Sequence, residues 1–266
     1  MGTYVFDPEW TAELERLRAL EALFDRPSAR YLSETGVGEG WRCLEVGCGA
    51  GGLARWLAER VRPSGRVVAI DLDTRFADGH GLDNLEVRRH DLMAAELEDE
   101  AFDLAHARAV IEHIPDHQGA LERMVAAVRP GGWVVIEEVD FGGRMAAALS
   151  DYAVPGEHLP LMERLYGAIE RMFASIGGDA RYGTRLLAGM EAAGLEHLGG
   201  ELHTPIVTAG QERWTHGTVA QLGPRMVSAG LLTEDELADF LALPADGSVR
   251  YLPPMMVTVW GRRPAA

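Results

Sequence analysis

The sequence predicts an α/β fold in which a doubly wound sheet of seven mostly parallel strands carries a helical cap. Three observations predict it. Five strand-like segments alternate with helical or loop segments between residues 42 and 140, as in a parallel sheet covered on both faces. A glycine-rich turn follows the first of these strands. After residue 141, helical segments surround two more strand signals, and we expect the last strand to be antiparallel.

The predicted elements follow from hydrophobic periodicity and from the turn residues that bound each run. The strands are short apolar runs at Arg42–Val46, Arg66–Asp71, Leu85–Arg89, Phe102–Ala107, Trp133–Asp140, Leu198–Thr208 and Met255–Arg263. The segments with helical character are Pro8–Phe24, Ser28–Ser33, Gly52–Arg60, Gln118–Val128, Met145–Ile176, Arg185–Ala193 and most of Glu212–Leu243. Together they describe one enlarged domain, which suits a chain of 266 residues.

Four regions are expected along the chain. Residues 1–40 are N-terminal helices that cover the site, and residues 41–142 are the cofactor-binding core. Residues 143–250 hold the remaining core elements with helical lid insertions, and residues 251–266 hold the final antiparallel strand.

The composition excludes several classes of function. The chain has 41 acidic and 25 basic residues, for a net charge of −16, which argues against nucleic acid as a partner. All basic residues are arginine, so lysine chemistry in Schiff bases and P-loops is absent. The two cysteines, Cys43 and Cys48, are too few for a disulfide framework or a four-cysteine metal site, and we expect no metal. No apolar run reaches the roughly 20 residues that cross a bilayer, so we expect a cytoplasmic protein without membrane insertion.

The glycine turn is compatible with two kinds of ligand. Gly47, Gly49 and Gly52 satisfy G-x-G-x-x-G, and Asp71 stands where an acid would bind a ribose, so a nicotinamide oxidoreductase is one alternative. Glu45 favours another ligand, because a carboxylate at the strand end would repel a pyrophosphate. The same carboxylate suits a ligand with ammonium and sulfonium cations, such as S-adenosylmethionine.

Several motifs together resemble one family. The segment Glu45–Gly51 is similar to the first motif, E/D-x-G-x-G-x-G, of class I S-adenosylmethionine-dependent methyltransferases. Further blocks agree with that family in order and spacing: Asp71, His90–Leu92, Phe102–Arg108 and Arg129–Gly132. The resemblance covers residues 41–141 and is strongest for small-molecule enzymes of the ubiquinone and menaquinone biosynthesis type. It implies a Rossmann-like fold and S-adenosylmethionine as cofactor.

The resemblance also implies which residues contact the cofactor. They are Glu45, Gly47, Gly49, Gly51, Asp71, Leu72, Asp91, Leu92, Ala107 and Arg108. By analogy with the family, Asp71 binds the ribose hydroxyls, Leu72 packs on the adenine and Asp91 accepts from its amino group. The backbone at Ala107 and Arg108 faces the methionine amino group. The alternative for each aspartate is a plain strand end or a helix N-cap.

Methyl transfer from a sulfonium is an in-line displacement, and much of its acceleration can come from positioning alone. A base is needed only when the nucleophile must lose a proton. The candidate catalytic residues are His113, Glu138 and Asp140. His113 follows the fourth strand, and the two carboxylates share a face at the end of the fifth. Their alternatives are a packed histidine and a solvated strand end.

The cap is expected to select the acceptor. Its aromatic, histidine and methionine residues, with those of the N-terminal region, are Tyr4, Tyr31, His158, Tyr166, Met172, Trp214, His216 and Met226. They favour a small, largely apolar acceptor over a macromolecule. We therefore expect methyl transfer to O, N or C of such a molecule in bacterial secondary metabolism. Two alternatives for the function are a quinone-type ring C-methyltransferase of primary metabolism and a cofactor-binding protein without activity. A homodimer is a further expectation for the assembly.

Overall fold

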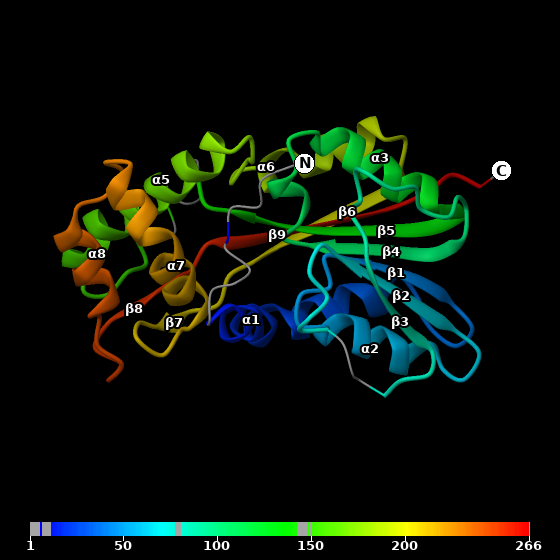
Figure 1. Cartoon of the computed structure of the whole chain (residues 1–266), viewed down its shortest axis with the longest axis horizontal. Helices are drawn as coiled ribbons and strands as arrows, with labels where there is room; N and C mark the ends of the chain where they lie inside the picture. Colours follow the sequence, from blue (N-terminus) through cyan, green and yellow to red (C-terminus); the bar gives the residue numbers. More distant parts are fainter. Residues whose placement is uncertain (1–5, 7–11, 78–80, 143–147, 149–150, 266) are drawn as a thin grey trace.

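A computed structural model describes residues 6, 12–77, 81–142, 148 and 151–265 of the chain. Its centre is a seven-stranded sheet with helices on both faces, as Figure 1 shows. The strands are β1 (Arg42–Val46), β2 (Arg66–Asp71), β3 (Leu85–Arg89), β4 (Phe102–Arg108), β5 (Val128–Asp140), β6 (Glu196–His203) and β9 (Met255–Arg262). Their order across the sheet is β3-β2-β1-β4-β5-β9-β6. Only β9 runs antiparallel to its neighbours, β5 and β6, which confirms the predicted fold class.

The sheet has its topological switch point between β1 and β4. From β1 the chain proceeds outward through β2 to β3, and it then returns to the other side of β1 to form β4 and β5. Ligands of doubly wound sheets bind where the strand order reverses, outside the carboxyl ends of the strands. The fold therefore directs attention to the loops that follow β1 and β4.

The alternation of side chains along β1 explains why both faces are covered. Cys43 packs with Leu53 and Leu57 of α2 (Gly52–Val61) on one face. Leu44 and Val46 point to the other face, toward α3 (His117–Ala127) and α6 (Gly183–Ala192). Figure 1 shows α1 (Glu13–Glu34) beside α2 on the first face and α3 beside α6 on the second.

The N-terminal region differs from the prediction of two helices. A single helix, α1, runs through Pro27, which was expected to lie between helices. The missing N–H of Pro27 is tolerated because α1 buries residues along its whole length, including Phe24, Tyr31 and Leu32. Residues 8–11, the predicted start of the first helix, lie outside the described residues.

The remaining helices form a lobe beyond one end of the sheet (Figure 1). The lobe comprises η2 (Gly156–His158), α5 (Leu159–Ser175), α7 (Trp214–Ser228), α8 (Glu234–Leu241) and the short strands β7 (Val207–Thr208) and β8 (Arg250–Tyr251). Its buried side chains form one apolar cluster with the end of β5. The predicted strand Leu198–Thr208 is two strands, because Pro205 between them has no N–H for the ladder.

The predicted helical segment Met145–Ile176 is only partly confirmed. Its start lies outside the described residues, and residues 151–158 form a turn, an isolated β-bridge at Val154 and η2, so the α-helix begins at Leu159. The predicted helix Arg185–Ala193 is confirmed by α6.

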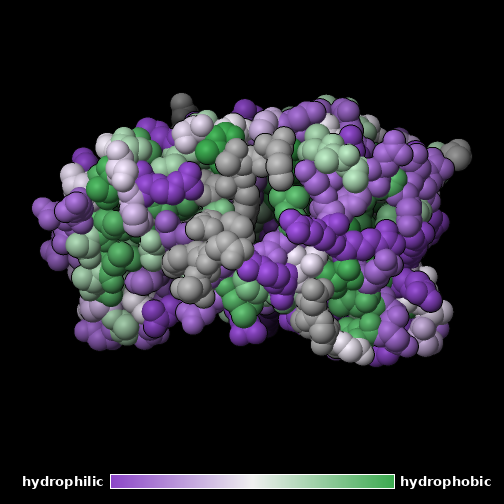
Figure 2. Space-filling model, viewed as in Figure 1, coloured by the Kyte–Doolittle hydropathy of each residue, from purple (hydrophilic) through white to green (hydrophobic). Residues whose placement is uncertain are grey.

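The large hydrophobic side chains that are exposed in the described ranges are Leu72, Tyr152, Val154, Leu187, Leu202 and Ile206. Figure 2 shows hydrophobic residues in several small groups, separated by hydrophilic ones, on the face it presents. None of the helices within the described ranges combines the length and the apolar character that a bilayer crossing requires.

Candidate active site

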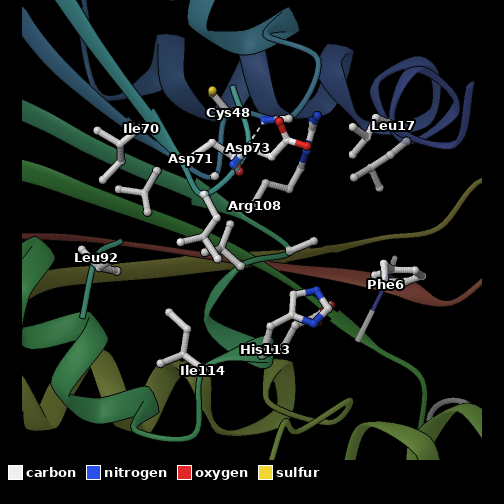
Figure 3. Close-up of a pocket in the computed structure, with 18 of the residues that line it drawn as sticks. Phe6, Leu17, Cys48, Ile70, Asp71, Asp73, Leu92, Arg108, His113 and Ile114 are labelled. Atoms are coloured by element: carbon white, nitrogen blue, oxygen red, sulfur yellow. Dashed lines mark hydrogen bonds and ion pairs between the residues drawn. The ribbon is translucent and has the colours of Figure 1, made fainter. Parts of the chain in front are cut away.

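A cavity of about 1210 Å³ opens at the switch point. Its wall includes the ends of β1, β2 and β4, residues 13–21 of α1 and the segment that follows β4. In Figure 3, Ile70 and Leu92 lie at one end of the cavity and Phe6 and Leu17 at the other. Arg108 and His113 lie between these ends, on opposite walls.

The turn after β1 forms the part of the wall nearest the switch point. Gly47, Gly49 and Gly51 adopt φ angles of 70°, 52° and 84°, which side chains with a Cβ rarely adopt. A Cβ on Gly47 would lie 2.1 Å from Cγ2 of Val110, in the loop that follows β4. The two loops therefore approach so closely that the first position of the turn has to be glycine.

Asp71, at the end of β2, faces this turn. One carboxylate oxygen accepts a hydrogen bond of 2.9 Å from the Gly49 N–H, and the other accepts one of 3.0 Å from the Asp73 N–H. Burial raises the pKa of Asp71, and the backbone donors oppose that rise. The neighbouring Leu72 leaves 50% of its surface exposed on the cavity wall, where a flat apolar ligand could cover it.

Asp91 and Leu92 follow β3 and complete the same end of the cavity. Asp91 accepts a hydrogen bond of 2.9 Å from the Met93 N–H. All residues predicted to contact a cofactor line the cavity except Gly51, at the N-cap of α2, and Ala107, which is fully buried within β4. The structure thus brings the separate sequence motifs to one cavity.

Glu45 is buried, and its partner was not predicted. Its carboxylate lies 2.7 Å from Nδ1 of His106, a fully buried residue of β4, and Nε2 of His106 lies 2.9 Å from Glu137 of β5. The Thr258 hydroxyl also donates to Glu137, at 2.8 Å. Burial alone would lower the pKa of His106, but the two carboxylates outweigh it and raise the pKa to about 9. The charged imidazolium of His106 therefore forms a buried ion pair with Glu45.

Of the three predicted catalytic residues, only His113 lines the cavity. Glu138 of β5 does not line the cavity, and it accepts hydrogen bonds of 2.9 Å and 3.2 Å from the N–H groups of Ile111 and Glu112. It thereby fixes the segment that carries His113. Asp140 accepts a hydrogen bond of 2.9 Å from the Gly142 N–H and is buried behind the wall.

Glu112 and Glu138 form a second buried acidic pair, which sequence reasoning did not identify. Burial raises the pKa of Glu138 to about 7, and burial together with the charge of Glu138 raises the pKa of Glu112 well above its usual value. Glu112 lines the cavity and accepts a hydrogen bond of 3.0 Å from the Val139 N–H. Burial and the neighbouring carboxylate of Glu138 therefore both favour the protonated form of Glu112.

His113 lies in η1 (Ile111–His113), directly after β4. Its ring centroid is 5.0 Å from that of Phe173 and 5.9 Å from that of Phe6. Burial, together with the positive charge of Arg16, lowers the pKa of His113 to about 3. The imidazole is therefore neutral at physiological pH and is a weak base.

The cap contributes fewer cavity residues than expected. Of the aromatic, histidine and methionine residues predicted to select the acceptor, only Trp214 is a described cavity residue, and Tyr4 lies outside the described residues. Tyr166, Met172 and Met226 pack inside the lobe instead. The aromatic residues Phe6, Phe141 and Phe173 take the wall positions beside Trp214.

The N-terminus of α2 provides a test of the alternative that the chain is a nicotinamide oxidoreductase. In dinucleotide-binding folds the pyrophosphate occupies the N-terminus of this helix. Here Glu21 of α1 accepts a hydrogen bond of 2.6 Å from the Gly52 N–H, so a carboxylate of the chain holds that position. The geometry therefore disfavours a pyrophosphate. Within the described ranges, no cluster of three His, Cys, Asp or Glu side chains could hold a metal ion.

A family model described as a methyltransferase domain matches residues 7–177. Methyltransferase str2 of Strobilurus tenacellus is 28% identical over 185 residues, which are 68% of this chain and 62% of that protein. Demethylmenaquinone methyltransferase of Staphylococcus aureus is 30% identical over 114 residues, which are 41% of this chain and 47% of that protein. The chain thus spans about half to three fifths of these relatives.

Among solved structures, a SAM-dependent methyltransferase from Aquifex aeolicus superimposes with a TM-score of 0.52 at 18% identity. The superposition covers 94% of this chain and 98% of the other, so the likeness extends over the fold.

Proposed function

Since the chain belongs to the methyltransferase-domain family, we propose that it transfers a methyl group from S-adenosylmethionine to O, N or C of a small, largely apolar molecule. The observation that carries this proposal is the cavity at the switch point. Its volume of about 1210 Å³ exceeds the roughly 300–1,000 Å³ of ordinary ligand pockets, which leaves space for a donor and an acceptor together.

The donor would occupy the end of the cavity next to β2 and β3. In this placement Asp71 binds the ribose hydroxyls, Leu72 and Leu92 pack on the adenine, and Asp91 accepts from the adenine amino group. These side chains line one continuous wall. The methionine part then crosses the glycine turn toward Glu45, whose negative charge suits its ammonium group.

The acceptor would occupy the end next to Phe6 and Phe173. Displacement at the methyl group needs the nucleophile in line with the sulfonium, and the neutral thioether leaves without acid assistance. Where the nucleophile carries a proton, His113 is the candidate acceptor on the cavity wall. Its lowered pKa makes it a weak base, so in this proposal positioning of the two substrates supplies most of the acceleration. Glu138 is a positioning residue in this proposal, and Asp140 has no direct role.

A role in bacterial secondary metabolism is part of this proposal. A second candidate is C-methylation of a quinone-type ring, favoured by the similarity to demethylmenaquinone methyltransferase over the core.

Calorimetric titration with S-adenosylhomocysteine and with NAD tests the proposal. We expect binding of the thioether and none of NAD. Asp71→Ala should weaken thioether binding at least tenfold, because two hydrogen bonds to a carboxylate are lost. The matched control is Asp83→Ala, an exposed aspartate paired with Arg62 outside the cavity, which should bind normally. NAD binding without thioether binding would contradict the proposal. Mass-spectrometric screening of phenols, indoles and quinones for one added methyl group then identifies the acceptor.

A further inference from the structure

The acceptor end of the cavity is lined by aromatic rings from four separate segments. Phe6, Phe141, Phe173 and Trp214 all line it, and each is at least 94% buried. The Phe6 and Phe173 rings meet edge to face, with centroids 6.4 Å apart, and Phe141 lies 5.9 Å from Phe173 and 6.1 Å from Trp214. Because aromatic rings pack well against one another in edge-to-face and offset arrangements, this lining favours a flat aromatic acceptor.

One hydroxyl group interrupts this apolar lining. Thr218 follows Trp214 by one turn of α7, so both residues lie on the same face of the helix, and both line the cavity. Thr218 is 1% exposed, and among the described residues its Oγ1 has no hydrogen-bond partner. A threonine within a helix often bonds back to the carbonyl four residues earlier, but Thr218 does not. Since a buried hydroxyl without a partner is costly, its natural partner is a ligand.

The charged groups at this end are neutralised. Arg16 and Glu13 of α1 form a buried bidentate pair, with N···O distances of 2.8 Å and 2.7 Å, and the Arg16 guanidinium lies 3.9 Å over the Phe6 ring. The pair packs against α7, since Arg16 Cγ lies 3.3 Å from the position that a Cβ on Gly217, the residue before Thr218, would occupy. His113 is neutral, since burial lowers its pKa to about 3, and burial favours the uncharged form of Glu112. An uncharged polar group therefore fits this wall better than a carboxylate or an ammonium group.

We propose that the methyl acceptor is an uncharged aromatic molecule with a hydroxyl or carbonyl oxygen, and that Thr218 determines specificity by hydrogen bonding to that oxygen. This inference rests on the proposed function and narrows its substrate class. It assigns recognition to Thr218 and no proton transfer.

The test uses the full chain saturated with S-adenosylhomocysteine and two probes of equal shape, 2-naphthol and 2-methylnaphthalene. Binding is followed by fluorescence. The wild-type protein should prefer 2-naphthol by about five- to tenfold, the effect of one hydrogen bond. Thr218→Val keeps the shape of the side chain and removes the hydroxyl, so it should abolish the preference by weakening 2-naphthol alone. Thr218→Ser should retain the preference. The anion 2-naphthoate should bind at least tenfold more weakly than 2-naphthol.

The matched control is Thr215→Val. Thr215 is equally buried on the same helix and does not line the cavity, so its substitution should leave the probe preference unchanged. The affinity for S-adenosylhomocysteine, measured first, shows that each variant is folded. A preference for 2-naphthol that survives in Thr218→Val would overturn the inference, as would failure of both probes to bind the saturated protein. Either result leaves the methyltransferase assignment standing, whereas a protein that does not bind S-adenosylhomocysteine contradicts the assignment itself.

Discussion

His106 of the central sheet pairs with Glu45, which lines the cavity. It lies between Glu45 and Glu137, and its imidazolium compensates two carboxylates that would otherwise repel each other in the core. The sequence contained a signal for this arrangement, because each of the three neighbouring strands has at least one ionisable residue within its apolar run. Periodicity alone could not pair them, since the order of strands across the sheet decides which residues meet.

The protonation of His106 predicts a dependence of stability on pH. Its pKa is raised from about 6.5 in the unfolded chain to about 9 in the folded protein. Because the folded state binds this proton more tightly, the stabilisation is complete below pH 6.5 and is lost as the pH rises through 9. Urea denaturation between pH 6.5 and 9.5 should therefore show a falling free energy of unfolding.

Glu112 and Glu138 also bind protons more tightly in the folded state, because their pKa values are raised. They lower the free energy of unfolding as the pH rises above about 4.5, for Glu138 up to about pH 7, so a substitution is needed to assign the alkaline slope to His106. The variant His106→Asn should be less stable at pH 7 and show a flatter profile above it. An unchanged slope in this variant would show that another group is responsible.

The role of Gly52 could not be predicted from the sequence motif. Gly52 is the third glycine of the G-x-G-x-x-G pattern, which made a nicotinamide oxidoreductase an alternative. In the structure, a Cβ at Gly52 would lie 2.5 Å from the Asp25 carboxylate and 2.7 Å from that of Glu21. The residue is small because α1 packs its carboxylates against the start of α2, a contact between segments that no local pattern reveals.

Among the elements, α1 connects most parts of the site. Its residues line the cavity from Glu13 to Glu21, and Asp25 and Ser28 bind the buried Arg108 of β4, at 2.6 Å and 2.9 Å. The helix thereby joins the N-terminal region to the switch point of the sheet.

Asp25→Ala should loosen this connection. It leaves the Arg108 guanidinium buried without its carboxylate, and because the Asp25 side chain is 34% exposed, we expect a loss of about 1–2 kcal/mol in the free energy of unfolding. Thioether affinity should fall as well, since α1 forms a wall of the cavity. Glu34→Ala is the control on the same helix, because its pair with Arg30 is exposed and should contribute less than about 0.5 kcal/mol. Equal effects of the two substitutions would refute the role of the Asp25 pair.

The elements themselves were predictable to different degrees. The bounds of β1, β2 and β3 follow from apolar runs enclosed by glycine, proline and charged residues, and the structure has the same bounds. The short pair β7 and β8 was not predicted, because two residues carry no periodicity and their pairing joins segments more than 40 residues apart. The acceptor wall was equally beyond prediction, since Phe6, Phe141, Phe173 and Trp214 meet only in the folded chain.

At the scale of the whole molecule, the cavity joins its two parts, because it lies between the parallel sheet and the helical lobe. Its walls include β1, β2 and β4 on one side and residues of α5 and α7 on the other. A ligand there contacts both parts, so its binding should stabilise the protein as a unit.

S-adenosylhomocysteine at a hundredfold excess over its dissociation constant should add about 2.7 kcal/mol of stability. For a chain of this length, that corresponds to a rise of about 5–10 °C in the midpoint of thermal unfolding. Differential scanning calorimetry measures the shift, with NAD at equal concentration as the control. A midpoint that does not move would show that the folded protein does not bind the thioether, and it would contradict the proposed cofactor.

The position of β9 has a consequence for synthesis. Of the strands in the main sheet it is the last in the chain, yet it lies between β5 and β6. While the ribosome is still adding residues before Met255, β5 and β6 both present unpaired edges to the cell. The nascent chain is thus most vulnerable to misassociation just before its final strand emerges, and a chaperone that shields strand edges would act in that interval.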